Sequence, residues 1–352
     1  MDREFDVAVI VCTYNRCGLL PKALESVLAQ DAGGVRYEVI VVDNNSTDET
    51  RAVVEGFISR GHDNLRYLFE GRQGKSYALN TGISNARAPV IAVTDDDICV
   101  EPKWLAAIKR AFDEHPEVDY VGGKVLPRWE GEPPAWLTPE HWAPLALQDY
   151  GDAPLYSNAE RPTCLLSISV RREAFDRVGF FSTEFLRIGA SSTEDHEFQI
   201  RLWRAGRQGL YVPDIVVVAD VQADRMTKAY HRKWHAGHGK SSAMMGLVEM
   251  IGPDGRLIKG EPPEAITLFG VPAPVYRELV VETRRWLVAR ARRRESSSFK
   301  HENQARQLVN YIRKRYEQHA AGRTRSSLAE VGAFARAMLR KKTRALPARA
   351  SK

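Results

Sequence analysis

Short apolar runs alternate with amphipathic helical stretches through the first 126 residues, and this alternation constrains the fold more than any other feature of the chain. Residues 7–11 and 38–42 are rich in Val and Ile, as strands buried on both faces are. Between them, Leu20, Leu24 and Val27 recur at helical intervals. The same alternation continues with strand patterns at 65–69, 90–94 and 118–126 and helix patterns at 47–58, 76–87 and 102–112. It predicts an α/β fold with a mostly parallel, doubly wound (Rossmann-like) sheet and helices on both faces.

The composition changes after residue 126, which predicts the division of the chain. Residues 127–162 hold seven of the 18 prolines and three of the seven tryptophans. This composition predicts a long loop, either a lid over a site or a structural loop anchored by its Trp side chains. Strand and helix patterns return up to residue 250. We therefore expect a domain over 1–250, made of halves 1–126 and 127–250, then a linker at 251–275 and a helical extension at 276–352.

The extension differs from the rest of the chain in charge. Residues 284–352 hold 20 Lys and Arg against 4 Asp and Glu, whereas residues 1–283 hold 31 against 41. Apolar residues at 276–290, 304–316 and 328–339 follow helical periods. Basic amphipathic helices fit an anionic membrane surface better than nucleic acid, and a zinc or RNA-binding motif is lacking. The alternative is that these helices pack on the preceding domain with their Arg faces in water.

The sequence also indicates a cellular setting. It has no apolar run of about 18 residues that would span a membrane. The opening MDREFDVAVIV lacks a signal-peptide pattern. The four cysteines are scattered, which argues against a disulfide framework or a zinc site. We expect a cytoplasmic protein, with attachment to the inner face of the membrane as the alternative.

Three adjacent carboxylates, Asp95, Asp96 and Asp97, follow the apolar run at 90–94. In an extended backbone, Asp95 and Asp97 point the same way, about 6.5–7 Å apart. Two carboxylates at that spacing can converge on one divalent ion, and oxygen ligands select Mg²⁺ or Mn²⁺. The alternative is a solvated acidic turn that caps the next helix.

Two further polar clusters follow the first and second predicted strands. Thr13, Tyr14, Asn15 and Arg16 form the first, and Asp43 and Asn44 begin the second. Each alone also fits turn formation and helix capping. Because ligands bind beyond the carboxyl ends of parallel strands, the clusters together predict a polar pocket at that edge of the sheet.

Five segments in this order carry a family resemblance: AVIVCTYNR, EVIVVDNNSTDET, GKSYALNTG, VIAVTDDDICVEPKWL and STEDHEFQIRLWRAG. Through residues 6–250 the chain resembles the inverting glycosyltransferases of family 2, which have the GT-A fold. The resemblance implies metal-dependent transfer of a sugar from a nucleoside-diphosphate sugar, expected to be UDP-linked, to an acceptor hydroxyl in polysaccharide, glycolipid or glycoconjugate synthesis. The half 1–126 would then bind the donor, and the half 127–250 would face the acceptor.

The resemblance also implies roles for individual residues. The nucleotide sugar would be held by Thr13, Tyr14, Asn15, Arg16, Asp43, Asn44, Lys75, Asp95 and Asp96. Asp95 and Asp97 would bind Mg²⁺ or Mn²⁺, and Asp220 stands near the position where many relatives have a histidine that completes the metal shell. Asp195 would be the general base, with Glu194 as its substitute. From the sequence pattern alone, Asp195 also fits a carboxylate that opens a helix.

Some motifs point elsewhere. Gly74-Lys75-Ser76 and Gly239-Lys240-Ser241 lack the upstream glycine of a phosphate loop. His231, His235 and His238 lack an acidic companion for a metal site, which favours a surface or acceptor-side role. Arg225 and Lys228 lie where the family places basic groups near the leaving diphosphate. The competing functions are a nucleic-acid- or membrane-binding protein and a sugar-nucleotide pyrophosphorylase. The second would need a Gly-rich loop near the N-terminus, and the segment TYNRCGLLPK of this chain matches such a loop poorly.

Overall fold

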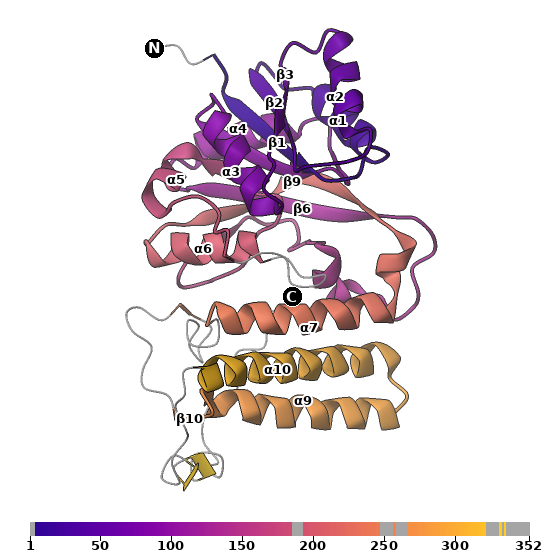
Figure 1. The fold of residues 1–352 in the computed structure, drawn as a ribbon, viewed down its shortest axis with the longest axis vertical. Helices are drawn as coiled ribbons and strands as arrows, with labels where there is room; N and C mark the ends of the chain where they lie inside the picture. Colours follow the sequence, from indigo (N-terminus) through magenta and orange to yellow (C-terminus); the bar gives the residue numbers. More distant parts are fainter. Residues whose placement is uncertain are drawn as a thin grey trace.

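The computed structural model describes residues 4–184, 193–246, 256–257, 266–321, 331–332 and 334–335. At its centre lies a sheet of nine strands in the order β3-β2-β1-β4-β8-β6-β9-β5, with β7 paired to β9 (Figure 1). The strands of this sheet are β1 Val7–Thr13, β2 Tyr37–Asp43, β3 Leu65–Phe69, β4 Val90–Asp95, β5 Ile98–Val100, β6 Tyr120–Trp129, β7 Leu155–Ser157, β8 Ser169–Arg171 and β9 Gly209–Val221. A separate hairpin pairs β10 Thr267–Leu268 with β11 Val271–Pro272.

Helices connect and follow these strands. The α-helices are α1 Leu20–Leu28, α2 Thr50–Ser59, α3 Lys75–Asn85, α4 Trp104–Glu114, α5 Arg172–Val178, α6 Glu194–Arg204, α7 Lys228–Met244, α9 Ala273–Ala291 and α10 Glu295–Ala321. Three short 3₁₀ turns are η1 Pro139–His141, η2 Ala143–Leu145 and η3 Ala223–Met226.

Helices cover both faces of the sheet, as the alternation predicts. In β1 the side chains of Val7, Val9 and Val11 share one core with the apolar faces of α1, α2 and α4. Ala8 and Ile10 face the other way and share a second core with α3, α5 and α6. Successive strand residues point to opposite faces, so an unbroken apolar run such as β1 serves both cores. The predicted doubly wound α/β fold is confirmed.

The second half of the sheet is mixed, which the sequence pattern did not indicate. β8 pairs antiparallel with both β4 and β6, while β5 and β7 pair antiparallel with β9. β8 has only three residues, Ser169–Arg171. The ladder between β6 and β9 shifts register near Gly123, where an added Cβ would lie 1.8 Å from the carbonyl oxygen of Ile215. Only glycine permits this approach of the two backbones.

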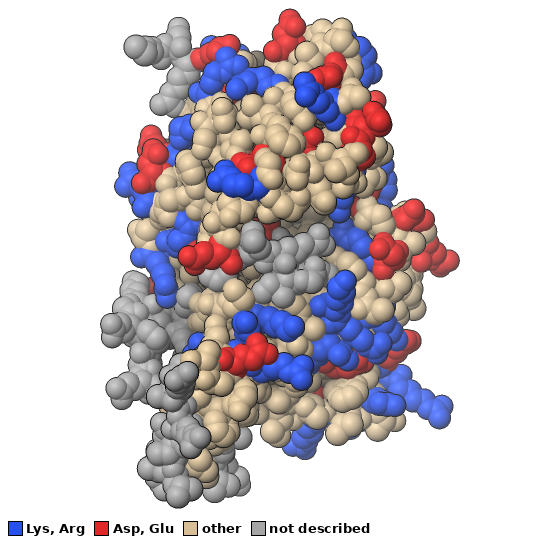
Figure 2. Space-filling view, viewed as in Figure 1, with Lys and Arg blue, Asp and Glu red and all other residues tan. Residues whose placement is uncertain are grey.

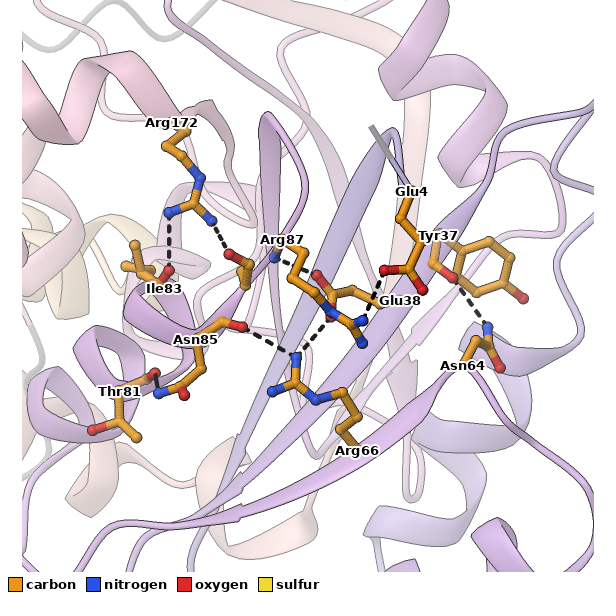
Figure 3. Close-up of polar contacts among 11 residues, drawn as sticks. Glu4, Tyr37, Glu38, Asn64, Arg66, Thr81, Ile83, Asn85, Arg87 and Arg172 are labelled. Atoms are coloured by element: carbon orange, nitrogen blue, oxygen red, sulfur yellow. Dashed lines mark hydrogen bonds and ion pairs between the residues drawn. The ribbon is translucent and has the colours of Figure 1, made fainter. Parts of the chain in front are cut away.

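A buried carboxylate joins α3 to the sheet at the end opposite the polar clusters (Figure 3). Glu38 of β2 is fully buried and accepts hydrogen bonds from the Arg66 guanidinium at 2.9 Å and the Arg87 backbone N–H at 2.5 Å. Arg66 also donates to the carbonyl of Asn85 at the end of α3. The charge of Glu38 is thus compensated by cations from β3 and from the residues after α3.

Three long helices form a layer beneath the sheet domain. Figure 1 shows α10 between α7 and α9, and α10 packs against both. α7 and α10 approach closely at Gly239, where an added Cβ would lie 2.2 Å from the carbonyl oxygen of Gln307. The helices predicted at 276–290 and 304–316 correspond to α9 and α10. Most of the third, at 328–339, and most of the linker at 251–275 lie outside the described residues.

The loop at 127–162 is anchored to this helical layer. The buried ring of Trp136 has its centre 4.7 Å from that of Phe299 in α10 and 5.0 Å from that of His231 in α7. His141 of η1 joins the same cluster, 5.6 Å from Trp136. The Trp-anchored alternative for this loop therefore matches the packing.

None of the helices that the structure describes combines the length and the apolar character needed to cross a bilayer.

Candidate functional site

The register of three parallel strands gathers the predicted site residues at one edge of the sheet. Thr13 at the end of β1 is opposite Asp43 of β2, and Cys12 is opposite Asp95 of β4. Neighbouring strands lie about 4.8 Å apart, so the three polar clusters lie side by side. This edge carries the carboxyl ends of the strands, where open α/β sheets bind ligands.

Arg16 lies against the aspartate triplet. Its Nη1 is 2.8 Å from Asp96 Oδ1 and 3.1 Å from Asp97 Oδ2. Arg225, in η3, brings its Nη1 to 3.5 Å from the same oxygen of Asp97. Burial raises the pKa of Asp96 to about 6, against the opposing effect of the Arg16 charge. Two arginines from distant parts of the chain therefore offset the repulsion among the three carboxylates.

Lys75 connects the aspartate triplet to the Glu194-Asp195 pair. Its Nζ is 2.7 Å from Asp95 Oδ1 and 3.8 Å from Glu194 Oε1. Burial lowers the pKa of Lys75, but the carboxylates of Asp95, Glu194 and Asp195 outweigh burial and raise it well above its usual value. Burial likewise raises the pKa of Asp95, but Lys75 outweighs this effect and lowers it. Segments 100 residues apart in the sequence thus share one charged centre.

Asp195 lies in the first turn of α6, after the N-cap residue Thr193. Burial, and then the charge of Glu194, raise the pKa of its carboxyl group to about 7, while the Lys75 charge opposes the shift. A carboxylate with a pKa near neutrality is matched to accepting a proton at physiological pH.

Asp43 is 3% exposed and both of its carboxylate oxygens accept hydrogen bonds. The backbone N–H of Ser46 donates to Oδ1 at 2.9 Å, and the Tyr67 hydroxyl donates to Oδ2 at 2.8 Å. Burial and the nearby carboxylate of Asp43 raise the pKa of Tyr67 to about 12. Tyr67 therefore holds the Asp43 side chain in a fixed orientation.

Asn44 holds the loop before α3. Its side-chain amide donates to the carbonyls of Glu70 and Arg72, at 3.2 and 2.7 Å, and its Oδ1 accepts the Gly74 N–H at 2.8 Å. Both amide hydrogens are used within the protein. In this structure Asn44 positions the loop that leads to Lys75, whereas the resemblance implies contact with the nucleotide.

The remaining residues of the first cluster differ in exposure. Thr13 is buried, whereas Tyr14 is 46% exposed at the rim of the site. Asn15 takes a left-handed backbone conformation with φ of 50°, and its Oδ1 accepts the N–H of Thr47 at 2.7 Å. Asn15 thus joins the loop after β1 to the loop after β2.

Asp220 lies beside the triplet, but its carboxylate is held by cations. Its backbone N–H donates to the carbonyl of Asp97 at 2.9 Å, while its side-chain oxygens lie 2.8 Å from Lys22 Nζ and 2.5 Å from Arg128 Nε. Across the described residues, no group of three or more His, Cys, Asp and Glu side chains is arranged to hold a metal ion. Cationic side chains lie against Asp220 as they do against Asp95 and Asp97, so all three stay predicted ligands.

Sequence reasoning missed several supporting residues. Tyr67, Lys22 and Arg128 come from segments without a motif, and only the three-dimensional pairing brings them to Asp43 and Asp220. Glu70 was also missed: the Arg72 side chain lowers its pKa to about 2, and its carboxylate accepts the Thr81 hydroxyl at 2.6 Å. The sequence signal for Tyr67 is strand alternation in β3, which predicts that Tyr67 and Phe69 lie on the same face of the sheet. It does not identify Asp43 as the partner of Tyr67.

Known proteins resemble this chain in sequence. Residues 8–179 match the family model described as glycosyl transferase family 2. The chain is 30% identical over 193 residues to a glucosyl-dolichyl phosphate glucuronosyltransferase of Haloferax volcanii, covering 54% of this chain and 60% of that protein. The chain thus spans less than two thirds of the length of this curated relative.

Two solved structures share the fold. TarS residues 1–349 of S. aureus, in complex with UDP, aligns with a TM-score of 0.50 and 18% identity, covering 91% of this chain and 93% of TarS. The mannosyltransferase PcManGT of Pyrobaculum calidifontis, in complex with GDP-Man and Mn²⁺, aligns with a TM-score of 0.51 and 20% identity, covering 96% and 82%. These two likenesses show the fold alone, and the match over residues 8–179 makes the chain similar to glycosyl transferase family 2.

Proposed function

We propose that this protein transfers a sugar, with inversion, from a nucleoside-diphosphate sugar to an acceptor hydroxyl. The observation that carries the proposal is the charged centre in which Lys75 joins Asp95 to Glu194, with Asp195 adjacent. It supports a donor site at this edge of the sheet, next to a carboxylate whose pKa suits a base. The match to glycosyl transferase family 2 over residues 8–179 supports the reaction class. We propose that the acceptor is a glycan or a lipid-linked sugar.

The donor's nucleotide is proposed to lie over the ends of β1 and β2, beside Asp43 and Tyr14. The buried carboxylate of Asp43, oriented by Tyr67, offers an acceptor for base or ribose hydrogens. UDP is the nucleotide that we propose. The TarS structure contains UDP and the PcManGT structure contains GDP-Man, so a test must include both nucleotides.

The donor set of the triplet fits a divalent ion. Asp95 and Asp97 present hard carboxylate oxygens, which Mg²⁺ and Mn²⁺ prefer. In this structure cationic side chains lie against both groups, which supports the proposal that positive charge is favoured here. When bound, the ion would stabilise negative charge on the departing diphosphate. Arg16 and Arg225 would add positive charge at the same oxygens.

Asp195 is the proposed general base. It would accept the proton of the acceptor hydroxyl as the oxygen attacks the anomeric carbon, and the carbon–diphosphate bond would break on the opposite face. General bases contribute about 10²–10⁴-fold to such reactions. Lys75 would keep Asp95 ionised, and Asn44 would keep the loop before Lys75 in place.

The proposal is tested with the full chain, a panel of UDP- and GDP-sugars, and Mn²⁺, Mg²⁺ or EDTA. Thermal stabilisation by one donor is expected only with metal and is expected to vanish in Asp95→Asn with Asp97→Asn. Asp113→Asn, an exposed carboxylate of α4 paired with Lys109, is the control and should keep the response. Donor binding that survives the double variant would contradict the proposed metal and diphosphate site.

We also propose that the outer face of α9 meets an anionic membrane surface. Val280, Val281, Leu287 and Val288 are exposed, and Arg284 lies on the same helical face. The opposite face, with Val275, Glu282 and Ala289, is buried. A row of exposed aliphatic side chains beside arginine is typical of helices that lie in a membrane interface.

Liposome sedimentation tests this surface. Val280→Ser with Leu287→Ser is expected to abolish binding of the full chain to vesicles that contain phosphatidylglycerol. Val309→Ser, an exposed aliphatic position on α10, is the control and should bind as the parent does. Equal binding by all three proteins would exclude α9 as the contact.

A further inference from the structure

A cavity of about 220 Å³ lies between the start of α7 and the turn that joins α9 to α10. Five basic side chains line it: Lys228 and Arg232 from α7, and Arg290, Arg293 and Arg294 from the end of α9 and the turn. Figure 2 shows Lys and Arg side chains gathered over these helix ends, on the right of the view. The proposed sugar transfer assigns no role to this cavity.

Acidic residues compensate only part of this charge. Lys228 Nζ lies 2.5 Å from Glu295 Oε1, and Arg232 Nε lies 2.7 Å from Glu302 Oε1. No carboxylate of a described residue lies within ion-pair distance of Arg290, Arg293 or Arg294. The residues that line the cavity therefore carry a net charge of +3. Like charges confined to one turn repel each other unless an anion or water separates them.

The cavity is also fixed in shape. The buried ring of Phe299 lies beneath Lys228 and Arg232, with its centre 5.5 Å from Lys228 Nζ and 5.5 Å from Arg232 Cζ. Two backbone hydrogen bonds, from Arg293 to Arg290 and from Arg294 to Ala289, hold the turn. The cations are thus presented on a prearranged frame, which lowers the entropic cost of binding an anion.

We propose that this cavity binds the phosphate or diphosphate group of a second ligand, distinct from the sugar donor. Guanidinium groups donate paired hydrogen bonds to phosphate oxygens. A phosphate has more oxygens than a carboxylate, so it suits a cavity with cations on two sides better than a carboxylate does. Lys228 follows Arg225 by three residues, and Arg225 contacts Asp97. The cavity and the proposed transfer site are thus joined by one short stretch of chain, residues 225–228. Its phosphate belongs either to a soluble compound or to a lipid head group.

Calorimetric titration of the full chain with inorganic pyrophosphate in EDTA tests the site without using sugar transfer. Arg290→Gln with Arg294→Gln is expected to weaken binding at least tenfold. Arg292→Gln with Arg313→Gln removes the same charge from exposed positions at the end of α9 and on α10, outside the cavity, and should change binding less than twofold. Equal weakening by both pairs, or no saturable binding by the parent protein, would overturn the proposal. Because metal and donor are absent, this outcome is independent of the proposed transfer reaction.

A second arm distinguishes the two sources of phosphate. Vesicles of phosphatidylcholine with phosphatidic acid are compared with vesicles of equal charge that contain phosphatidylglycerol. A lipid source predicts that the cavity variant loses its preference for phosphatidic acid while the control variant keeps it. A soluble source predicts pyrophosphate binding that depends on the cavity, together with vesicle binding that is the same in both variants.

Discussion

At the scale of single residues, the position of Asp195 between Glu194 and Lys75 determines both its charge and its expected use. Burial and Glu194 raise its pKa to about 7. The group is protonated below that pH and can act as a base only above it. Its neighbours therefore set the pH range in which the proposed reaction proceeds.

Replacing Asp195 with Asn removes the proposed base without changing the size of the side chain. We expect kcat to fall by about 10²–10⁴-fold. In the parent protein, kcat should fall as the pH drops below about 7, because the carboxyl group is then protonated. Initial rates from pH 5.5 to 8.5 measure both effects. A flat profile, or an Asp195→Asn variant with parental activity, would transfer the role to another group.

Glu38 provides a prediction about stability. Glu38→Ala removes the carboxylate that Arg66 and the Arg87 N–H share, so their hydrogen bonds are lost inside the sheet. The free energy of unfolding should fall by about 2–4 kcal/mol. Urea denaturation measures the loss, and Glu55→Ala, which removes an exposed partner of Arg51, should leave the midpoint unchanged. A similar midpoint for both variants would show that the network around Glu38 contributes little.

The motif residues could be located from the sequence because strand-end chemistry is local. Asp43 and Asp95 each follow an apolar run, and parallel pairing then brings them together. The partners of these residues could not be found in that way. The contacts of Tyr67, Arg128 and Lys22 depend on pairings between segments that are distant in the sequence. The contacts by which Asn44 holds the loop before α3 depend on the position of residues 70–74 in the folded chain.

At the scale of elements, strong periodicity predicts helices and parallel strands well, whereas short strands escape it. β5, β7 and β8 have three residues each, too few for a period to show. Their antiparallel pairing depends on neighbours that are distant in the sequence. The C-terminal helices had the right periodicity, but the sequence did not indicate which of their faces would meet α7.

The contact between α7 and α10 depends on Gly239. In Gly239→Ala, the new Cβ would meet the backbone of Gln307, so the helices must separate. We expect a loss of about 1–3 kcal/mol in the free energy of unfolding. Gly56→Ala in α2, where an added Cβ has open space, should instead stabilise the protein by about 0.5–1 kcal/mol. Chemical denaturation of the two variants compares them directly, and the same sign for both would contradict the packing.

The cluster between the 127–162 loop, α7 and α10 should respond to acid. Burial, and then the charges of His235 and His141, lower the pKa of His231 to about 3, below its unfolded value near 6.5. Between these values the unfolded chain binds a proton that the folded chain does not, so stability falls as the pH falls. From pH 6.5 to pH 5 the loss should be about 2 kcal/mol. His231→Phe should show a shallower dependence of melting temperature on pH, and an unchanged slope would assign the acid sensitivity elsewhere.

At the scale of the whole molecule, the sheet and the helical layer share apolar contacts. Phe299 of α10 belongs to the same core cluster as the strands and helices on one face of the sheet. Trp136 is the link between them, because it contacts Phe299 and His231. Unfolding of one part should therefore expose apolar surface of the other.

Phe299→Ala tests this cooperation. The variant should lose about 3–5 kcal/mol of stability, because a large buried ring is removed. Calorimetry should show a single transition for the parent protein and a lower melting temperature for the variant. Val309→Ala on the exposed side of α10 is the control and should melt with the parent. Two separated transitions in the parent would show that the sheet and the helices unfold independently.

The position of α10 between α7 and α9 has a consequence for folding during synthesis on the ribosome. Translation delivers α7 first, then α9, and only afterwards the segment that lies between them. Until Phe299 has left the exit tunnel, the indole of Trp136 lacks one of its ring contacts and α9 lacks the helix against which it packs. A nascent chain halted near residue 290 would thus expose apolar surface of α7 and α9, to which chaperones bind.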